Sequence, residues 1–278
     1  MPQPNLADRP IHSRWRLWTG LCAVWIGANL LLYFDPFEWL ARKPKRPTTA
    51  ALRLYQERVW TSPSPSGDDA HRLLYRVLEP TDTSKPQPLL LFLHGSGERG
   101  DDNQLQLIGL PSQLVESRWR KLFTGFVIAP QCPKGESWTG KLDAVESLLD
   151  DWRKNQRVDG RRVYVTGLSM GGYGTWALAA RRSEWIAAAV PICGGGDTRI
   201  AEKLVSVPIW AVHGLDDRSV PPKASREMVE AIRAAGGKPQ LLELPGVGHD
   251  SWTQTYHDPD GVLAWMFRQV NDRCDECR

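Results

Sequence analysis

Short apolar runs alternate with longer amphipathic segments from about residue 52 onward. The runs 89–93 and 126–129 are apolar at every position, as strands buried on both faces of a parallel sheet are. The segment 142–156 places its apolar residues at helical spacing and comes just before the β-branched and aromatic run 163–166. This alternation predicts an α/β fold, in which a mostly parallel, twisted sheet is covered by helices on both faces. We expect strands at 52–60, 72–78, 89–93, 126–129, 163–166, 185–192, 209–212 and 240–244, and helices at 142–156, 223–235, 262–270 and directly after Ser169.

The connections between these segments add two features to the predicted fold. The first two strands, 52–60 and 72–78, are joined by the turn-rich segment 61–69, which predicts an antiparallel hairpin at the start of the sheet. Only residues 197–207 separate the sixth strand from the seventh, and a connection of that length cannot hold a large lid domain. We therefore expect a site that is open to bulky or polymer-linked substrates.

The strand 163–166 leads directly into Gly167-Leu168-Ser169-Met170-Gly171, and a helix of small residues follows. This is the sequence pattern of a nucleophile elbow, a turn that holds its serine in a sparsely allowed backbone conformation. The residues two before and two after the serine approach each other closely in such a turn, so glycine at 167 and 171 is a steric requirement. Ser169 is therefore our candidate nucleophile, and the helix that begins beneath it directs amide donors toward the same point.

Two backbone amides are candidates for an oxyanion hole. Met170 supplies the first, because in this turn the residue after the nucleophile donates its N–H. The second is expected from the loop after strand 89–93, which reads His-Gly-Ser-Gly-Glu-Arg-Gly at 94–100. We nominate the N–H of Ser96, since a neighbouring glycine lets a substrate carbonyl approach. His94 is expected to tie this loop rather than to act as a base, because it precedes the turn.

An acid and a base follow later strands, in the chain order that a serine triad on this architecture requires. The loop after strand 209–212 carries Asp216 and Asp217, and either can reach behind an imidazole and fix its tautomer. The loop after the last strand carries His249. His257 is a weaker candidate for the base, because it lies at the approach to the final helix. The order serine, aspartate, histidine favours His249.

The loop after strand 126–129 should rise at the carboxyl edge of the sheet, where open α/β folds bind their ligands. Gln131 and Trp138 are therefore candidate pocket residues, with simple packing within the loop as an equal alternative. Glu98, beside the nominated oxyanion amide, could contact substrate or pair with Arg99. The sequence contains no phosphate-cradling or metal-ligand motif, so neither a cofactor nor a metal is expected.

Residues 17–34 form an apolar run without charged side chains that is long enough to cross a bilayer. Aromatic residues flank it where an interfacial belt would lie. We predict a single membrane anchor within an N-terminal segment 1–41, and a cleaved signal peptide is the alternative, although no A-x-A site follows the run. Basic residues on both sides leave the orientation of the anchor open. A basic, proline-containing linker is expected at 42–51, a catalytic domain at 52–271 and a charged tail at 272–278.

Composition limits the partners and the redox chemistry of the chain. Lys and Arg number 35 against 32 Asp and Glu, and a net charge of +3 does not indicate nucleic-acid binding. The 5 cysteines lack the spacing of a disulfide framework. Cys132 and Cys193 follow apolar runs and are expected to be buried, whereas Cys274 and Cys277 form a lone C-x-x-C that is too little for a zinc site. The sequence does not predict an oligomeric state.

From about residue 52 to residue 270 the chain resembles the α/β-hydrolase superfamily. Within it, the chain is similar to the bacterial dienelactone-hydrolase-like group of predicted peptidases, which is related to phospholipase/carboxylesterases and feruloyl-esterase-like enzymes. The resemblance rests on LLLFLHGSGERGDD, VIAPQCP, GLSMGGYGTW, VPICGGGD, HGLDDRSVPP and PGVGHDSW. In these relatives the acid stands in H-G-x-x-D-x-x-V-P, which implies Asp217 here. Dienelactone hydrolases proper use a cysteine nucleophile, whereas this chain has Ser169.

The resemblance implies a serine hydrolase that cleaves small-molecule or polymer-linked carboxylic esters through an acyl-enzyme. A peptidase or amidase with the same triad is the alternative, and a membrane-tethered binding module without catalysis is a third hypothesis from a different class. With the predicted anchor, we expect a bacterial membrane protein whose catalytic domain lies outside the cytoplasm, or a secreted protein if the apolar run is cleaved.

Overall fold

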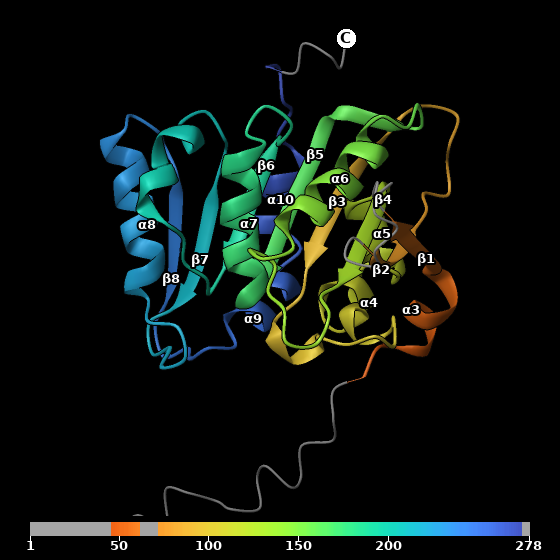
Figure 1. The fold of residues 1–278 in the computed structure, drawn as a ribbon, viewed down its shortest axis with the longest axis horizontal. Coiled ribbons are helices and arrows are strands. Elements are labelled where there is room, and N and C mark those ends of the chain that lie inside the picture. Colours follow the sequence, from red (N-terminus) through yellow and green to blue (C-terminus); the bar gives the residue numbers. More distant parts are fainter. Residues whose placement is uncertain (1–45, 62–71, 274–278) are drawn as a thin grey trace, which may run out of the picture. The chain divides into compact units, whose positions relative to one another are not determined.

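A sheet of eight strands runs through the part of the chain that the computed structural model describes, residues 46–61 and 72–273 (Figure 1). The strands lie in the order β1-β2-β4-β3-β5-β6-β7-β8. β1 pairs antiparallel with β2, β2 pairs antiparallel with β4, and the remaining pairs are parallel. The predicted mostly parallel sheet and its initial antiparallel pair are therefore confirmed. The strands are β1 Gln56–Thr61, β2 Arg72–Leu78, β3 Gln87–Leu93, β4 Phe126–Gln131, β5 Val158–Leu168, β6 Ala188–Ile192, β7 Trp210–Gly214 and β8 Gln240–Leu244.

Helices cover both faces of this sheet, as predicted. The α-helices are α3 Thr49–Leu54, α4 Leu110–Gln113, α5 Ser117–Leu122, α6 Leu142–Arg153, α7 Met170–Arg181, α8 Lys223–Ala234, α9 Ser251–His257 and α10 Val262–Phe267. Three 3-10 helices are η3 Ser96–Glu98, η4 Leu105–Leu107 and η5 Thr198–Leu204. Side chains of α6, α7 and α8 belong to one hydrophobic cluster, and side chains of α3, α5, α9 and α10 belong to another.

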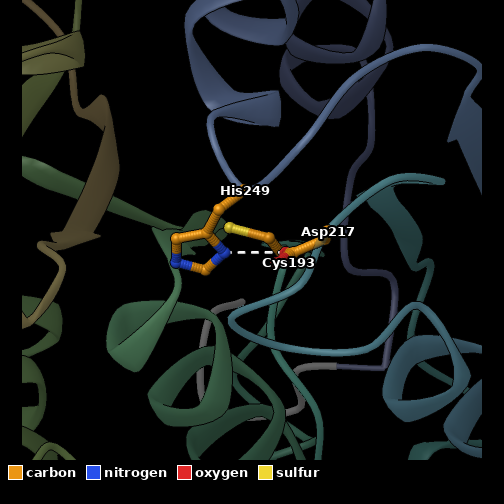
Figure 2. A group of neighbouring side chains, drawn as sticks. All are labelled: Cys193, Asp217 and His249. Atoms are coloured by element: carbon orange, nitrogen blue, oxygen red, sulfur yellow. Dashed lines mark hydrogen bonds and ion pairs between the residues drawn. The ribbon is translucent and has the colours of Figure 1, made fainter. Parts of the chain in front are cut away.

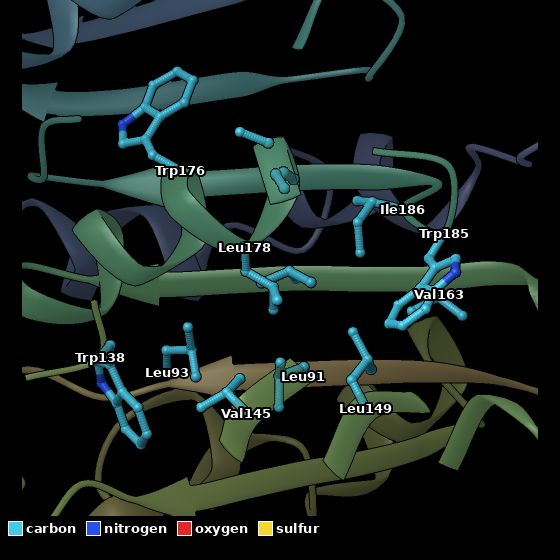
Figure 3. Close-up of a cluster of buried hydrophobic side chains, with 14 of the residues drawn as sticks. Leu91, Leu93, Trp138, Val145, Leu149, Val163, Trp176, Leu178, Trp185 and Ile186 are labelled. Carbon is cyan, nitrogen blue, oxygen red and sulfur yellow. The ribbon is translucent and has the colours of Figure 1, made fainter. Parts of the chain in front are cut away.

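β3 explains why the central strands are apolar at every position. Leu89, Leu91 and Leu93 belong to the cluster under α6 and α7, part of which Figure 3 shows. Leu90 and Phe92 point to the opposite cluster. Because successive side chains of a strand face opposite sides of the sheet, both sets are removed from water. The central strand is thereby fixed between two cores, and its carboxyl end provides a rigid support for the loop that follows.

The beginning of the domain differs from the prediction. Residues 52–54 belong to the helix α3, not to a strand, and β1 begins only at Gln56. Thr48 caps the helix, because its hydroxyl accepts a hydrogen bond from the Ala51 N–H at 3.1 Å. This cap and the two alanines that follow favour a helical turn over the strand that the apolar spacing suggested. The helix α9 was also not predicted, because its seven polar and aromatic residues carry little helical periodicity.

The connection between β6 and β7 contains only η5, so this described part of the chain inserts no large lid domain, as predicted. The predicted membrane anchor at 17–34 lies outside the described residues, as do the linker up to residue 45 and the C-x-x-C of the tail. Among the residues that the structure does describe, no helix has both the length and the apolar character needed to cross a bilayer.

Candidate active site

Ser169 lies at the junction of β5 and α7, where its backbone adopts φ 52° and ψ −116°. Few residues other than glycine occupy positive φ, and such a conformation persists only where the surroundings hold it in place. The amide N–H of Ser169 donates to the carbonyl oxygen of Ile192 on β6 at 2.9 Å, which fastens the turn to the sheet. The junction therefore has the sharp strand-to-helix geometry that the sequence predicts.

Gly167 and Gly171 pack against backbone atoms that leave no room for a side chain. A Cβ on Gly167 would lie 2.4 Å from the carbonyl oxygen of Gly171. A Cβ on Gly171 would lie 1.9 Å from the carbonyl oxygen of Leu93 at the end of β3. Both distances are far inside van der Waals contact, so the predicted steric requirement for glycine at these positions is confirmed.

Three side chains from separate loops meet beside this turn. His249 Nε2 lies 2.9 Å from Ser169 Oγ. His249 Nδ1 lies 2.7 Å from Asp217 Oδ2, the hydrogen bond drawn in Figure 2. With its hydrogen on Nδ1, the imidazole donates to the carboxylate and accepts the hydroxyl hydrogen of Ser169. The side chain of His249 is 27% exposed, so a substrate can reach it, whereas that of Asp217 is fully buried. The structure thus brings together the predicted nucleophile, base and acid.

Asp217 is held as a carboxylate in this arrangement. Its Oδ1 accepts hydrogen bonds from the N–H groups of Ser219, at 2.8 Å, and Val220, at 2.9 Å. Burial alone would raise the pKa of Asp217, but the hydrogen bonds from His249 and from the two amides outweigh it and hold the pKa below its ordinary value of 3.8. The neighbouring Asp216 is exposed, so of the two aspartates it is Asp217 that meets His249.

His94 ties the loop after β3 to its surroundings. Its Nε2 accepts a hydrogen bond from the Cys132 N–H at 2.9 Å, so the hydrogen sits on Nδ1, which lies 2.6 Å from the carbonyl oxygen of Gly95. Burial lowers the pKa of His94 to about 4, which keeps the ring neutral at neutral pH. His94 therefore has the structural place in the loop that the sequence predicts.

The two nominated oxyanion amides begin helices that start near each other. Met170 and Ser96 are the first residues of α7 and η3, so their N–H groups have no acceptor within the helix. Among the described residues, neither amide donates to another backbone group outside its helix. A Cβ on Gly171 would lie 2.9 Å from the carbonyl oxygen of His94, two residues before Ser96, so the start of α7 lies against the loop that leads into η3. Two amides that bind one oxygen must lie close together in this way.

The three candidate pocket residues, Gln131, Trp138 and Glu98, differ in how far their side chains are exposed. Gln131 is 1% exposed and Trp138 is 0% exposed. The side-chain oxygen of Gln131 accepts from the Asn103 N–H at 2.7 Å, and the indole N–H of Trp138 donates to the carbonyl oxygen of His94 at 2.9 Å. Both side chains therefore pack within the loops, which is the alternative that the sequence analysis gave to a role in a pocket. Glu98 keeps a side chain that is 23% exposed, 4.0 Å from His94.

A cavity of about 580 Å³ lies along α7, where residues of α6 and η5 also line it. Tyr173, one helical turn after Ser169, lines it, and the pKa of Tyr173 is raised by burial and by the nearby Asp217. The lining is apolar at Leu142 and Ala177 and includes basic side chains of α7 and η5. Sequence reasoning did not find this cavity, because its walls come from elements that only the packing of the helices brings together.

One group of side chains has donor atoms that could in principle hold a metal ion. Those of Cys193, Asp217 and His249 all lie within 4.8 Å of one another (Figure 2). His249 and Asp217 are, however, already joined by a hydrogen bond of 2.7 Å, and burial raises the pKa of the Cys193 thiol to about 12, which keeps it protonated. These three side chains therefore fit a hydrogen-bonded histidine and carboxylate beside a neutral thiol better than they fit a metal centre.

Comparison with known proteins finds that the chain is similar to esterases and to dienelactone hydrolases. Residues 135–261 match the dienelactone hydrolase family, and this segment includes Ser169, Asp217 and His249. The chain is 32% identical, over 158 residues, to the bifunctional acetylxylan esterase/xylanase XynS20E of Neocallimastix patriciarum. This match covers 55% of this chain and 22% of that protein. The chain spans between about a fifth and a half of the length of the first curated relatives that it matches.

Solved structures show the same fold. The crystal structure of a thermostable esterase is 33% identical, with a TM-score of 0.73, and the match covers 79% of this chain and 64% of that one. A ferulic acid esterase is 20% identical, with a TM-score of 0.55 over 77% of this chain and 98% of that one, which is evidence for the fold alone. The chain therefore has the α/β-hydrolase fold.

Proposed function

We propose that this chain is a serine hydrolase that cleaves carboxylic esters through an acyl-enzyme. The match to the dienelactone hydrolase family and the α/β-hydrolase fold support this proposal. The observation that carries the proposal is the pair of hydrogen bonds, 2.9 Å and 2.7 Å long, that connects Ser169 through His249 to Asp217. A serine in this setting gains nucleophilicity because the imidazole can take its proton as the hydroxyl oxygen attacks.

The reaction proceeds in two half-reactions. Ser169 Oγ bonds to the ester carbonyl carbon while His249 Nε2 takes the hydroxyl proton, and Asp217 stabilises the resulting imidazolium. The amides of Met170 and Ser96 donate to the oxyanion of the tetrahedral intermediate. His249 then returns the proton to the departing alcohol, which leaves an acyl group on Ser169. Water, deprotonated by the same imidazole, attacks the acyl carbon; the bond to Ser169 Oγ breaks, His249 returns the proton to that oxygen, and the acid is released.

The relatives favour esters over amides, and the openness of the site bears on the size of the substrate. The bifunctional relative and the structure that is 33% identical are both named as esterases. The serine is also reached without a large lid, because only η5 lies between β6 and β7. An open site suits an acyl group attached to a bulky alcohol, including an acyl group on a polymer.

A matched pair of substrates tests this choice. The full-length protein is assayed with an aryl ester and with the anilide of the same acid, so that only the leaving group differs. We expect turnover of the ester and little or none of the anilide. Selective cleavage of the anilide would reverse the ranking and favour the peptidase or amidase. An acyl series on the ester arm, from acetyl to feruloyl, then defines the preferred acid.

We further propose that residues 17–34 anchor the protein to a bacterial membrane with its catalytic domain outside the cytoplasm. The length and charge-free composition of this run support the proposal. Fractionation of cells that express the full chain tests it. Retention in the membrane fraction after a salt wash is expected, and an N-terminus that begins after residue 41 on a salt-extractable protein would overturn the anchor.

A further inference from the structure

His213 is a second imidazole beside Asp217, and the reaction described above gives it no role. It lies at the end of β7 and is 0% exposed. Its Nε2 is 3.3 Å from Asp217 Oδ2, the same oxygen that lies 2.7 Å from His249 Nδ1. The acid of the triad therefore lies close to two imidazoles, one that faces the nucleophile and one that is completely enclosed.

The hydrogen bonds of His213 fix which atom carries its hydrogen. Nε2 is 2.9 Å from the carbonyl oxygen of Val220 and 3.3 Å from the Asp217 carboxylate. A carbonyl oxygen can only accept, so Nε2 carries a hydrogen and donates it to Val220. The N–H of the same Val220 donates to Asp217 Oδ1 at 2.9 Å. His213 thus lies beside the carboxylate and binds the residue whose N–H holds the carboxylate's other oxygen.

The opposite side of the ring is fixed by α8. His213 Nδ1 lies 2.7 Å from Ser225 Oγ, and the same hydroxyl oxygen lies 2.8 Å from the carbonyl oxygen of Gly194. Ser225 is also 0% exposed. One buried ring therefore connects β7, the acid loop and α8, and Ser225 extends the contact to the loop after β6. A ring held at both nitrogens cannot turn, so the direction of its Nε2–H toward Val220 is set by the fold.

We propose that His213 is a positioning residue for Asp217: by binding the Val220 carbonyl oxygen, it holds the acid loop in the place from which the Val220 N–H orients the carboxylate toward His249 Nδ1. This inference rests on the proposed function, because it assigns a purpose to the orientation of Asp217. The amides of Ser219 and Val220 orient Oδ1 only while their loop stays in place. The hydrogen bond from His213 fixes that loop to the end of β7. When His249 gains the proton of Ser169, the anion is then already aligned with the positive charge.

Two amide substitutions of different reach test the proposal. The Gln side chain in His213→Gln can place an N–H near the position of Nε2, whereas the shorter side chain in His213→Asn reaches only the position of Nδ1. Loss of the hydrogen bond to the Val220 carbonyl oxygen, worth about 1 kcal/mol, predicts that His213→Asn lowers kcat by roughly 10-fold. KM should change little, because the substrate does not touch His213. His213→Gln should recover most of the lost kcat.

Two further readouts separate positioning from a general loss of structure. Rates are expressed per active site titrated with a fluorophosphonate, so that misfolded protein does not count. The low-field proton NMR signal of the His249 Nδ1–H is recorded in each variant, and we expect it to move in His213→Asn and to return in His213→Gln. Equal kcat per titrated site in wild type and His213→Asn, or an unmoved proton signal, would overturn the proposal.

Ser225→Ala is the second variant, for use if the histidine substitutions prevent folding. It leaves the ring in place but removes the hydroxyl that holds Nδ1, so a smaller fall in kcat and a shift of the same proton signal are expected. Wild-type values for both would contradict the positioning role. If the wild-type protein does not react with the fluorophosphonate at all, the proposed function fails instead, which keeps the two failures distinct.

Discussion

Replacement of His249 by alanine is expected to lower kcat for ester hydrolysis by roughly a million-fold, because removal of the base of a serine triad disables the nucleophile as well. Ser169 Oγ would lose the partner that lies 2.9 Å away, and the hydroxyl would keep its proton. The expected fold of the variant is unchanged, since His249 is partly exposed and makes few core contacts. Steady-state kinetics on an aryl ester, with circular dichroism on the same sample, measure the effect.

His257→Ala is the matched control. His257 is the other histidine of this region, and its ring lies 2.9 Å from Gln113 Nε2 and 2.7 Å from the Thr253 carbonyl oxygen rather than beside Ser169. It is exposed, so its removal should leave kcat near the wild-type value. Loss of activity in His257→Ala together with retained activity in His249→Ala would show that His257, and not His249, is the base.

Gly171→Ala is expected to destabilise the protein by about 3 kcal/mol or more, at the upper end of what overpacking costs. The added Cβ would meet the carbonyl oxygens of Leu93 at 1.9 Å and His94 at 2.9 Å. These are backbone atoms of the central strand and its loop, so they cannot move aside as a flexible side chain could. Any variant that does fold should lose activity, because the elbow and the oxyanion loop would separate.

Gly97→Ala provides the comparison for stability, since a Cβ at Gly97 would meet no atom within 4 Å. Its free energy of unfolding should lie within about 0.5 kcal/mol of the wild-type value. Denaturant unfolding of the two variants and the wild type makes the measurement. A Gly171 variant as stable and active as Gly97→Ala would show that the elbow tolerates a side chain.

The elbow could be predicted from the sequence because its rules are local. A glycine two residues before the serine and another two residues after it are demanded by backbone contacts inside one turn, and the structure has those contacts. The chain order of serine, acid and base could be predicted for a similar reason, because each residue follows directly from the end of a buried strand. The choice between Asp216 and Asp217 needed the resemblance, and the geometry agrees with it.

The pocket could not be predicted in this way, because its lining depends on long-range packing. Trp138 looks like a binding residue in the sequence, yet its indole N–H bonds to His94, 44 residues earlier in the chain. The side-chain amide of Gln131 similarly makes hydrogen bonds to Asn103, Glu98 and Asp102. The cavity beside α7 instead uses Leu142 and Ala177, which the sequence shows only as helical core positions.

The same limit explains the helix α3. Its apolar residues alternate in a way that also suits a strand, and the Thr48 cap that decides for the helix is a single side-chain hydrogen bond. His213 is a further example. The sequence places it in a His-Gly pair before the acid loop, like His94 before the oxyanion loop, but only the structure shows that its Nε2 binds the Val220 carbonyl oxygen and lies 3.3 Å from Asp217 Oδ2.

The most direct test of the central claim, that Ser169 is a nucleophile activated by His249 and Asp217, is covalent labelling with a fluorophosphonate. The purified full-length wild type and Ser169→Ala are treated with the probe, and the labelled peptide is identified by mass spectrometry. The account predicts stoichiometric phosphonylation of the wild type on Ser169 and none of the variant. Equal labelling of both proteins, or a label on a different residue of the wild type, would contradict it.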